Sequence, residues 1–297
     1  MEFDFHKISL DDKEIYKKYA PEIQGFFGWE YNFAMTWIWN VFDETKIFDA
    51  GDMAFVRTKF YDNCVYFPPM LRNQKQLKDA LRFIEEQCAR DGCDMDLRGL
   101  IKSQVEELDK NRYEITSDRG SSDYIYDAKT LRELSGKKFH GKRNHIARFC
   151  NLYKHEFRPY NEITDYSRIL ALYKKWDAQA AHETLDLEEK VITRALDAYK
   201  SLGLKISVLC VGERIAAFSV NVADNPFIAH TFLEKADTDF DGAYQTINQK
   251  TAQEFFKDAV YVNRQEDMNI EGIRKAKLSY RPVMLLDKYR VQLKKKI

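Results

Sequence analysis

The sequence predicts an α/β protein of the α+β type, in which two tandem domains each hold a mixed, mostly antiparallel sheet flanked by helices. The chain has 297 residues, which is enough for about two average domains. Its residues are 44% apolar and 32% charged, a composition typical of folded globular proteins and not of disordered or disulfide-scaffold chains. The third observation is that one order of helices and strands can be followed twice along the chain.

The second half shows this order most clearly. Ile169, Tyr173 and Trp176 recur at spacings of three and four, which predicts one apolar stripe of a helix. Gly212 and Glu213 form a two-residue loop suited to a hairpin between two β-rich segments. The predicted elements, in the order β α α β β β α β α β, are strand 155–161, helices 165–177 and 187–202, strands 205–211, 215–222 and 227–234, helix 241–258, strand 259–263, helix 270–280 and a β segment after residue 282.

The first half repeats this order with almost no shared residues. Gly51 and Asp52 predict a hairpin turn, and Pro68 and Pro69 end the third strand because proline cannot donate to a ladder. The predicted elements are strand 3–9, helices 11–20 and 29–42, strands 46–50, 53–60 and 64–67, helix 76–88, strand 94–97, a helix near 103–110, and β segments at 113–116 and 124–126.

The repeated order predicts a tandem duplication; the alternative is that two unrelated α+β segments match by chance. We expect domains at residues 1–127 and 154–297, joined by a basic helix at 128–153. From residue 134 to residue 155 this stretch carries six cations and no acidic residue: Lys137, Lys138, Lys142, Arg143, Arg148 and Lys154. The whole chain has 47 basic and 47 acidic side chains, so any polyanion must be bound by a local patch of this kind.

The five cysteines are odd in number and form no C-x-x-C pair, which fits reduced thiols in the cytosol. The amino terminus lacks the apolar segment of a signal peptide, and no run of about 18 apolar residues could cross a bilayer. We therefore expect a cytoplasmic protein, with peripheral attachment to a membrane as the alternative.

Familiar catalytic motifs are absent. Gly136 to Arg143 approaches a P-loop, but Arg143 stands where a Ser or Thr should bind Mg²⁺, and no apolar strand precedes it. The sequence also lacks G-x-S-x-G, H-E-x-x-H, and a G-x-G-x-x-G that follows a strand. The sequence therefore contains no motif that supports nucleotide hydrolysis, serine hydrolysis, zinc proteolysis or dinucleotide binding. We also expect no metal site.

Polar residues gather instead in the last third of the chain. His230 and Glu234 are predicted to share one face of a strand, where they could supply a general base or form a solvated strand end. Asn263 and Arg264 follow a strand, where binding residues often lie. Cations at spacings of three and four on the last helix could bind a phosphate or form a solvated face; these are Arg274, Lys277 and Arg281.

Several segments in order resemble a known family. They are YIYD (124–127), GKKFHGKRN (136–144), GERIAAF (212–218), HTFLEKAD (230–237) and YVNRQEDMNIEGIRKAKLSYRP (261–282). Together they resemble the C-terminal domain of bacterial phosphatidylglycerol lysyltransferases over nearly the whole chain. That family is similar to Fem-type aminoacyl-tRNA ligases, and the resemblance implies two tandem GNAT-like (acyltransferase-superfamily) domains. The lysyltransferases proper also carry an integral-membrane flippase half with no counterpart in this sequence, which leaves a lipid acceptor open.

The chemistry implied by the resemblance is acyl transfer, with the active site in the second half. Lys277 and Tyr280 match a Fem-like K-x-x-[FY] ending, which implies an oxyanion or phosphate ligand and a proton donor. Glu234 and His230 complete the expected catalytic set. The expected substrate-binding residues are Lys138, Lys142, Arg143, Asn144, Asn263, Arg264, Arg274 and Arg281.

Three functions remain open. The first is transfer of an aminoacyl group from charged tRNA, bound through the basic patch, to a lipid head group or small amine or hydroxyl. The second is acyl-CoA-dependent N-acylation, although the loop ADTDFDGAYQ (236–245) lacks the glycine pattern that cradles a pyrophosphate, and its Asp237, Asp239 and Asp241 would repel one. The third is a non-catalytic binding protein. No cofactor is expected, because the acyl donor is a co-substrate.

Overall fold

A computed structural model describes residues 4–23, 25–41, 44–60, 63–179, 185–223 and 225–294. The chain forms two compact units, and both are discontinuous in sequence. Unit 1 comprises Met1–Asp123, Glu266–Arg274 and Leu285–Ile297, and unit 2 comprises Tyr124–Gln265 and Lys275–Met284. Within the described residues, no helix combines the length and the apolar character needed to cross a bilayer.

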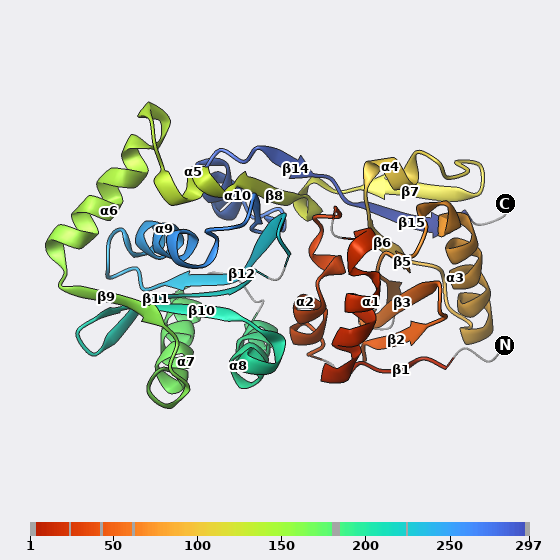
Figure 1. The fold of residues 1–297 in the computed structure, drawn as a ribbon, viewed down its shortest axis with the longest axis horizontal. Helices are drawn as coiled ribbons and strands as arrows, with labels where there is room; N and C mark the ends of the chain where they lie inside the picture. Colours follow the sequence, from red (N-terminus) through yellow and green to blue (C-terminus); the bar gives the residue numbers. More distant parts are fainter. Residues whose placement is uncertain are drawn as a thin grey trace. The chain divides into compact units, whose positions relative to one another are not determined.

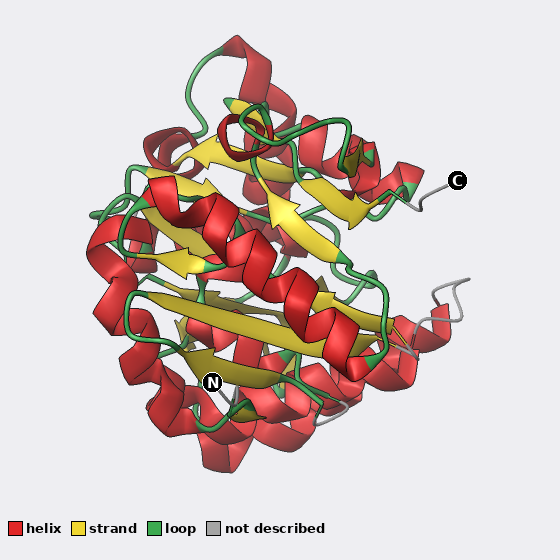
Figure 2. Cartoon of the chain, turned by 90° about the vertical axis from the view of Figure 1, so that its right-hand side faces the viewer, coloured by secondary structure: helices red, strands yellow, loops and turns green. Residues whose placement is uncertain are grey.

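Unit 1 contains a mixed sheet with the strand order β1-β2-β3-β4-β6-β15-β7, to which β5 adds by pairing with β3. The strands are β1 (His6–Lys7), β2 (Lys46–Asp49), β3 (Met53–Phe60), β4 (Asn63–Tyr66), β5 (Met70–Leu71), β6 (Leu97–Leu100), β7 (Tyr113–Ser117) and β15 (Tyr289–Leu293). The helices are α1 (Lys13–Ile23), α2 (Phe33–Ile38), α3 (Leu77–Asp91) and α4 (Lys102–Val105). The long helix α3 lies against this sheet (Figure 2), where Leu81 and Ile84 are fully buried.

Unit 2 contains a second sheet, in the order β14-β8-β13-β12-β11-β10-β9. Its strands are β8 (Asp123–Asp127), β9 (His155–Pro159), β10 (Lys205–Val211), β11 (Arg214–Val222), β12 (Ile228–Ala236), β13 (Tyr261–Asn263) and β14 (Met284–Leu286). The helices are α5 (Ala128–Glu133), α6 (His140–Leu152), α7 (Glu162–Gln179), α8 (Leu185–Leu202), α9 (Ala243–Phe255) and the second half of α10 (Glu271–Leu278), whose residues up to Arg274 belong to unit 1. Helix α9 covers one face of the sheet and α7 the other, as the contacts of Glu234 with Asn248 and of Lys235 with Trp176 show (Figure 1).

The two sheets share one construction. In each, three antiparallel strands (β2–β4 and β10–β12) lead through a helix (α3 or α9) to a strand that pairs in parallel with the third. A parallel pairing needs such a crossover connection. The repeated order predicted from the sequence is therefore present in three dimensions.

The last strand of each half of the chain lies in the sheet of the other half. β8 pairs with β13 in the second sheet, whereas β15 lies between β6 and β7 in the first (Figure 1). The units therefore differ from the domains expected at residues 1–127 and 154–297. Residues 128–153 are not a separate linker, because α5 and α6 pack on α9 within unit 2.

Two predicted helices are shorter than expected. The helix predicted at 29–42 is a 3₁₀ turn at Trp29–Tyr31 followed by α2, because Asn32 caps α2 by accepting a hydrogen bond from Met35 N. Residues 42 and 43 lie outside the described residues. The helix predicted near 103–110 is the single turn α4.

A group of four charged residues lies inside unit 1. The Lys288 ammonium is 3.1 Å from Glu30 Oε1, 3.0 Å from Asp123 Oδ1 and 3.4 Å from Glu266 Oε2. Gly99 leaves room for the Glu30 carboxylate, since a Cβ there would lie 2.9 Å from Glu30 Cδ. Burial raises the pKa of Glu30 to about 7; Lys288 opposes this shift and Asp123 adds to it. One buried cation among three carboxyls thus favours a retained proton.

Glu30 should make the stability of the protein depend on pH. Its folded-state pKa lies above its ordinary value, so the folded chain keeps a proton that the unfolded chain releases, and the stabilisation is lost as the pH rises from about 4.5 to about 7. Glu30→Gln should remove this slope, with an effect on the order of 1 to 3 kcal/mol across that range. Urea unfolding at a series of pH values measures it.

The control is Glu86→Gln, which changes an exposed carboxylate of α3. Parallel stability curves for Glu30→Gln and the unmodified protein between pH 5 and pH 8 would show that Glu30 is ionised throughout.

Candidate functional site

Two neighbouring strands of unit 2 separate at their ends. In the described structure, β12 and β13 run parallel and pair over Ile228–His230 and Tyr261–Asn263. β12 then continues to Ala236, whereas β13 stops. Glu234 lies on the part of β12 beyond this pairing, and Arg264 directly follows β13. Their side chains meet where the two strands no longer exchange hydrogen bonds.

Glu234 and Arg264 form a buried ion pair. Arg264 Nη2 donates to Glu234 Oε1 at 2.8 Å, and Asn248 Nδ2 of α9 donates to the other carboxylate oxygen at 3.1 Å. The Arg264 and Glu234 side chains are 12% and 9% exposed. Burial opposes the guanidinium charge, but Glu234 outweighs it, and the pKa of Arg264 is raised. The cation is therefore permanent, and removing its carboxylate would leave an uncompensated buried charge.

Two tyrosine rings flank this guanidinium. The Arg264 Cζ atom lies 5.0 Å from the centre of the Tyr280 ring and 5.6 Å from that of Tyr126. Within the described part of the chain, its Nε and Nη1 groups are buried and have no hydrogen-bond acceptor. Burial is the main cause that raises the pKa of Tyr280, so its phenol keeps its proton at neutral pH.

Lys142 of α6 also lies against the Tyr280 ring. Its Nζ lies 4.0 Å from the centre of that ring, and the residue is half-buried. Burial, followed by the charge of Arg264, lowers the pKa of Lys142 to about 8, against the opposing effect of Glu234. We call Glu234, Arg264, Tyr280 and Lys142 the unit 2 polar centre.

Lys277 lies beside this centre, but its ammonium binds the backbone. Its Nζ donates to the carbonyls of Arg264 at 2.7 Å and Gln265 at 3.1 Å. Gln265 has a φ of 58°, a left-handed conformation that is costly for a residue with a side chain. The Lys277 carbonyl in turn accepts from Tyr126 Oη at 2.9 Å. The expected oxyanion ligand therefore holds the turn that presents Arg264.

His230 and Glu234 do not share a face, contrary to the sequence prediction. The pairing of β11 with β12 shifts by one residue at Val220 and Asn221, so that Glu234 lies opposite Ser219 and His230 opposite Val222. A β-bulge of this kind adds a residue and inverts the alternation. His230 is 3% exposed, and burial lowers its pKa to about 4, which keeps the ring neutral.

The other predicted binding residues lie apart from the polar centre or serve the local fold. Arg274, in unit 1, bonds to both Asp267 oxygens at 2.8 and 3.0 Å. Asn263 Oδ1 accepts from Gln265 N, and Arg143 Nη1 donates to the carbonyls of Leu134 and Gly136. The exposed residues of the predicted binding set are Lys138, Asn144 and Arg281.

Helix α6 covers the N-terminus of α9. Gly242 caps α9 with a φ of 90°, and a Cβ on it would lie 2.3 Å from the His145 carbonyl oxygen. Arg148 pairs with Asp241 at 2.8 Å at the same place. Asp237 and Asp239 both pair with Lys175 and with Arg214, so two cations balance these two carboxylates, which do not repel an anion as the sequence suggests. The close packing of α6 obstructs this helix end instead.

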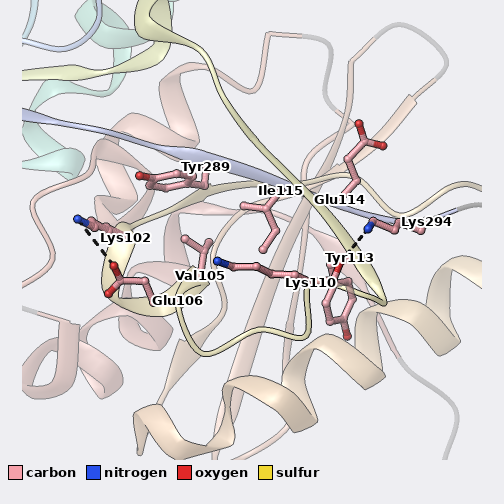
Figure 3. A pocket seen from close by; sticks show the side chains of 9 residues that line it. All are labelled: Lys102, Val105, Glu106, Lys110, Tyr113, Glu114, Ile115, Tyr289 and Lys294. Atoms are coloured by element: carbon pink, nitrogen blue, oxygen red, sulfur yellow. Dashed lines mark hydrogen bonds and ion pairs between the residues drawn. The ribbon is translucent and has the colours of Figure 1, made fainter.

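A separate hollow of about 520 Å³ opens on unit 1 (Figure 3). It is lined by Val105, Ile115 and Tyr289 and by charged residues, which include an ion pair of 3.7 Å between Lys102 and Glu106. Within the described residues, no group of three or more His, Cys, Asp and Glu side chains could hold a metal ion.

Sequence reasoning did not identify Tyr126 and Asn248, which contact Arg264 and Glu234 of the polar centre. Tyr126 belongs to YIYD, a segment noted above for its resemblance, and its strand joins the second sheet. Asn248 carries no local signal, since a polar residue within a predicted helix is ordinarily solvent-exposed.

Comparison with known proteins identifies the family. Residues 23–292 match the family described as phosphatidylglycerol lysyltransferase, C-terminal. The chain belongs to this family. The resemblance stated from the sequence segments is thereby confirmed.

Solved structures agree with this assignment. A conserved protein of unknown function from Bacteroides thetaiotaomicron is 31% identical, with a TM-score of 0.91 over 99% of this chain and 100% of that one. L-PGS from Bacillus licheniformis is 14% identical, with a TM-score of 0.69 over 96% and 93% of the two chains. A tandem GNAT protein from the clavulanic acid biosynthesis pathway is 8% identical, with a TM-score of 0.55 over the full length of both. The predicted tandem GNAT-like fold is confirmed, and family and fold together point to an acyltransferase.

Lys277→Ala should lower the stability of the protein, because two carbonyls of a left-handed turn lose a charged donor. We expect a loss of about 1–3 kcal/mol in the free energy of unfolding, measured with urea. The control is Lys275→Ala, an exposed residue of the same helix, with an expected change below about 0.5 kcal/mol. Equal stability of the two variants would contradict the positioning role and favour a free ammonium.

Proposed function

We propose that this chain is an aminoacyltransferase, which takes an aminoacyl group from charged tRNA and passes it to a hydroxyl or amine, such as a phosphatidylglycerol-like head group. The observation that supports the proposal is that unit 2 has a charged polar centre while the N-terminus of α9 is obstructed. In acyl-CoA-dependent GNAT relatives, the amides before this helix hold the pyrophosphate, as the sequence resemblance implies. Here the backbone of α6 lies against Gly242 at that position.

The polar centre has the groups that acyl transfer requires. An ester carbonyl develops negative charge as the nucleophile adds to it, and a fixed buried cation can stabilise that charge. Arg264 is held in place by Glu234, by the Tyr126 and Tyr280 rings, and through its carbonyl by Lys277. The Tyr280 phenol retains its proton and can donate a hydrogen bond. Within the described chain, its hydroxyl makes no hydrogen bond that would compete.

A tRNA donor also needs a cationic surface, and only part of the predicted patch is available for one. Arg143 and Arg148 are used by the backbone and by Asp241. Lys137, Lys138 and Lys154 are exposed at the two ends of α6. We assign the contact with tRNA phosphates to these three lysines.

The transfer assay uses total tRNA charged with a mixture of labelled amino acids, together with vesicles of phosphatidylglycerol or of phosphatidylcholine. We expect the protein to accelerate deacylation and to move label into a lipid or a small acceptor. Labelled acetyl-CoA, tested in parallel, should give no transfer. Transfer from acetyl-CoA without transfer from tRNA would overturn the proposal.

Charge reversal tests the surface that we assign to tRNA. Lys137→Glu, Lys138→Glu and Lys154→Glu together should weaken tRNA binding at least tenfold and reduce the slope of log affinity against log salt by about 2 to 3, since each phosphate contact contributes roughly 0.7 to 0.9. Filter binding at several salt concentrations measures both. Lys190→Glu with Lys257→Glu, on exposed parts of α8 and after α9, is the control. Equal salt slopes for the two variants would place tRNA elsewhere.

A further inference from the structure

We infer that the Lys142 amine is the base of the unit 2 polar centre: it takes the proton of the attacking group and returns it to the leaving group. This inference rests on the proposed function, because the attacking and leaving groups are those of aminoacyl transfer. The observations below concern the state of the amine and stand apart from the choice of substrate.

The surroundings of Lys142 disfavour its charged form. Lys142 is half-buried beside the permanent cation of Arg264, and within the described chain its Nζ has neither an ion-pair partner nor a hydrogen-bond acceptor. The Tyr280 ring face, 4.0 Å from Nζ, attracts a cation but replaces neither of these partners. The charged groups that act on Lys142 are Arg264, which follows β13, and Glu234 of β12. Glu234 is already bound by Arg264 and Asn248, so its carboxylate is not free to pair with the amine.

The other lysines near this region have their donors satisfied. Lys277 binds two carbonyls, and Lys235, on the opposite face of the sheet, pairs with Glu188 at 3.0 Å and lies 3.4 Å from the centre of the Trp176 ring. Lys142 differs because, within the described chain, it has no ion-pair partner or hydrogen-bond acceptor, while the charge of Arg264 acts against its own. Such an amine loses its proton more readily than an exposed one, and its lone pair then becomes available.

The proton balance of the step closes within the centre. The acceptor oxygen or nitrogen forms a bond to the aminoacyl carbonyl carbon while its proton passes to Lys142 Nζ. The tetrahedral intermediate then collapses, the ester bond to the terminal ribose of the tRNA breaks, and the ribose oxygen takes the proton from the Lys142 ammonium. No net proton is gained or lost, and no oxidant or metal is required.

Amine labelling tests the state of Lys142 without any substrate. The protein is treated with trace acetic anhydride at pH values from 6 to 11, and each labelled lysine is quantified by mass spectrometry. We expect the labelling of Lys142 to rise with a midpoint near pH 8, the value to which burial and Arg264 lower its pKa. The reference is Lys190, an exposed residue of α8. A Lys142 midpoint at or above that of Lys190 would overturn the inference.

The kinetics of aminoacyl transfer test whether Lys142 acts as the base. Lys142→Ala should reduce single-turnover transfer from charged tRNA by 10²-fold or more, as is typical when a general base is removed. Added ethylamine should restore part of the rate, which a merely structural role would not allow. Lys142→Arg keeps a cation without a usable lone pair and should stay slow, whereas Lys190→Arg should be unaffected.

The possible failures are distinguishable. Full activity of Lys142→Arg, or no rescue of Lys142→Ala by ethylamine, overturns the inference that Lys142 is the base. Neither result contradicts the proposal of aminoacyl transfer. A neutral Lys142 in a protein that transfers no label from any charged tRNA overturns the aminoacyl transfer and the base role with it.

Discussion

The buried ion pair of Arg264 with Glu234 organises unit 2 around the place where β12 and β13 separate. A guanidinium that is 12% exposed cannot lose its charge at neutral pH, so the fold must surround it with groups that tolerate a cation. The carboxylate comes from β12, its second hydrogen bond from Asn248 of α9, and two ring faces from Tyr126 and Tyr280. Lys277 of α10 fixes the turn behind it. One buried charge thereby sets the positions of side chains from four elements (β12, α9, β8 and α10) and from the turn after α10.

The exchange of terminal strands explains how residues from both halves of the sequence reach this centre. β13 and β6 each lie beside a parallel partner and need a second neighbour on the other edge, because unpaired strand edges leave backbone groups unsatisfied. β8 fills this position in the second sheet and β15 in the first. Tyr126 accordingly enters the centre from a segment that the sequence assigns to the first domain. The residues flanking Arg264 thus depend on a pairing between segments more than 130 positions apart.

Local patterns were sufficient for much of this fold. The strands at 53–60 and 205–211 match their predicted bounds, because clear turn residues or glycines flank long β-rich runs. Glu234, Arg264, Lys142 and Tyr280 were selected from the sequence as charged or aromatic residues at element ends and in family-like segments, and they lie together. The predicted face of His230 was wrong because one bulge inverts the alternation. Arg274 was expected at the site, but the buried carboxylate of Asp267 holds it in unit 1, and single-sequence periodicity contains no information on such a tertiary partner.

Helix α6 links the choice of acyl donor to the chemistry of the centre. Its residues His145 and Phe149 lie against Gly242 and obstruct the helix end at which an acyl-CoA pyrophosphate would be held, as the resemblance to GNAT relatives implies. The same helix carries Lys142 to the Tyr280 ring. A helix that moved away to admit a pyrophosphate would also withdraw the amine, and the centre would lose the group that we propose as its base. The position of α6 therefore determines both the packing at Gly242 and the proposed proton transfer at Lys142. This position favours an acyl donor whose phosphates bind away from the N-terminus of α9.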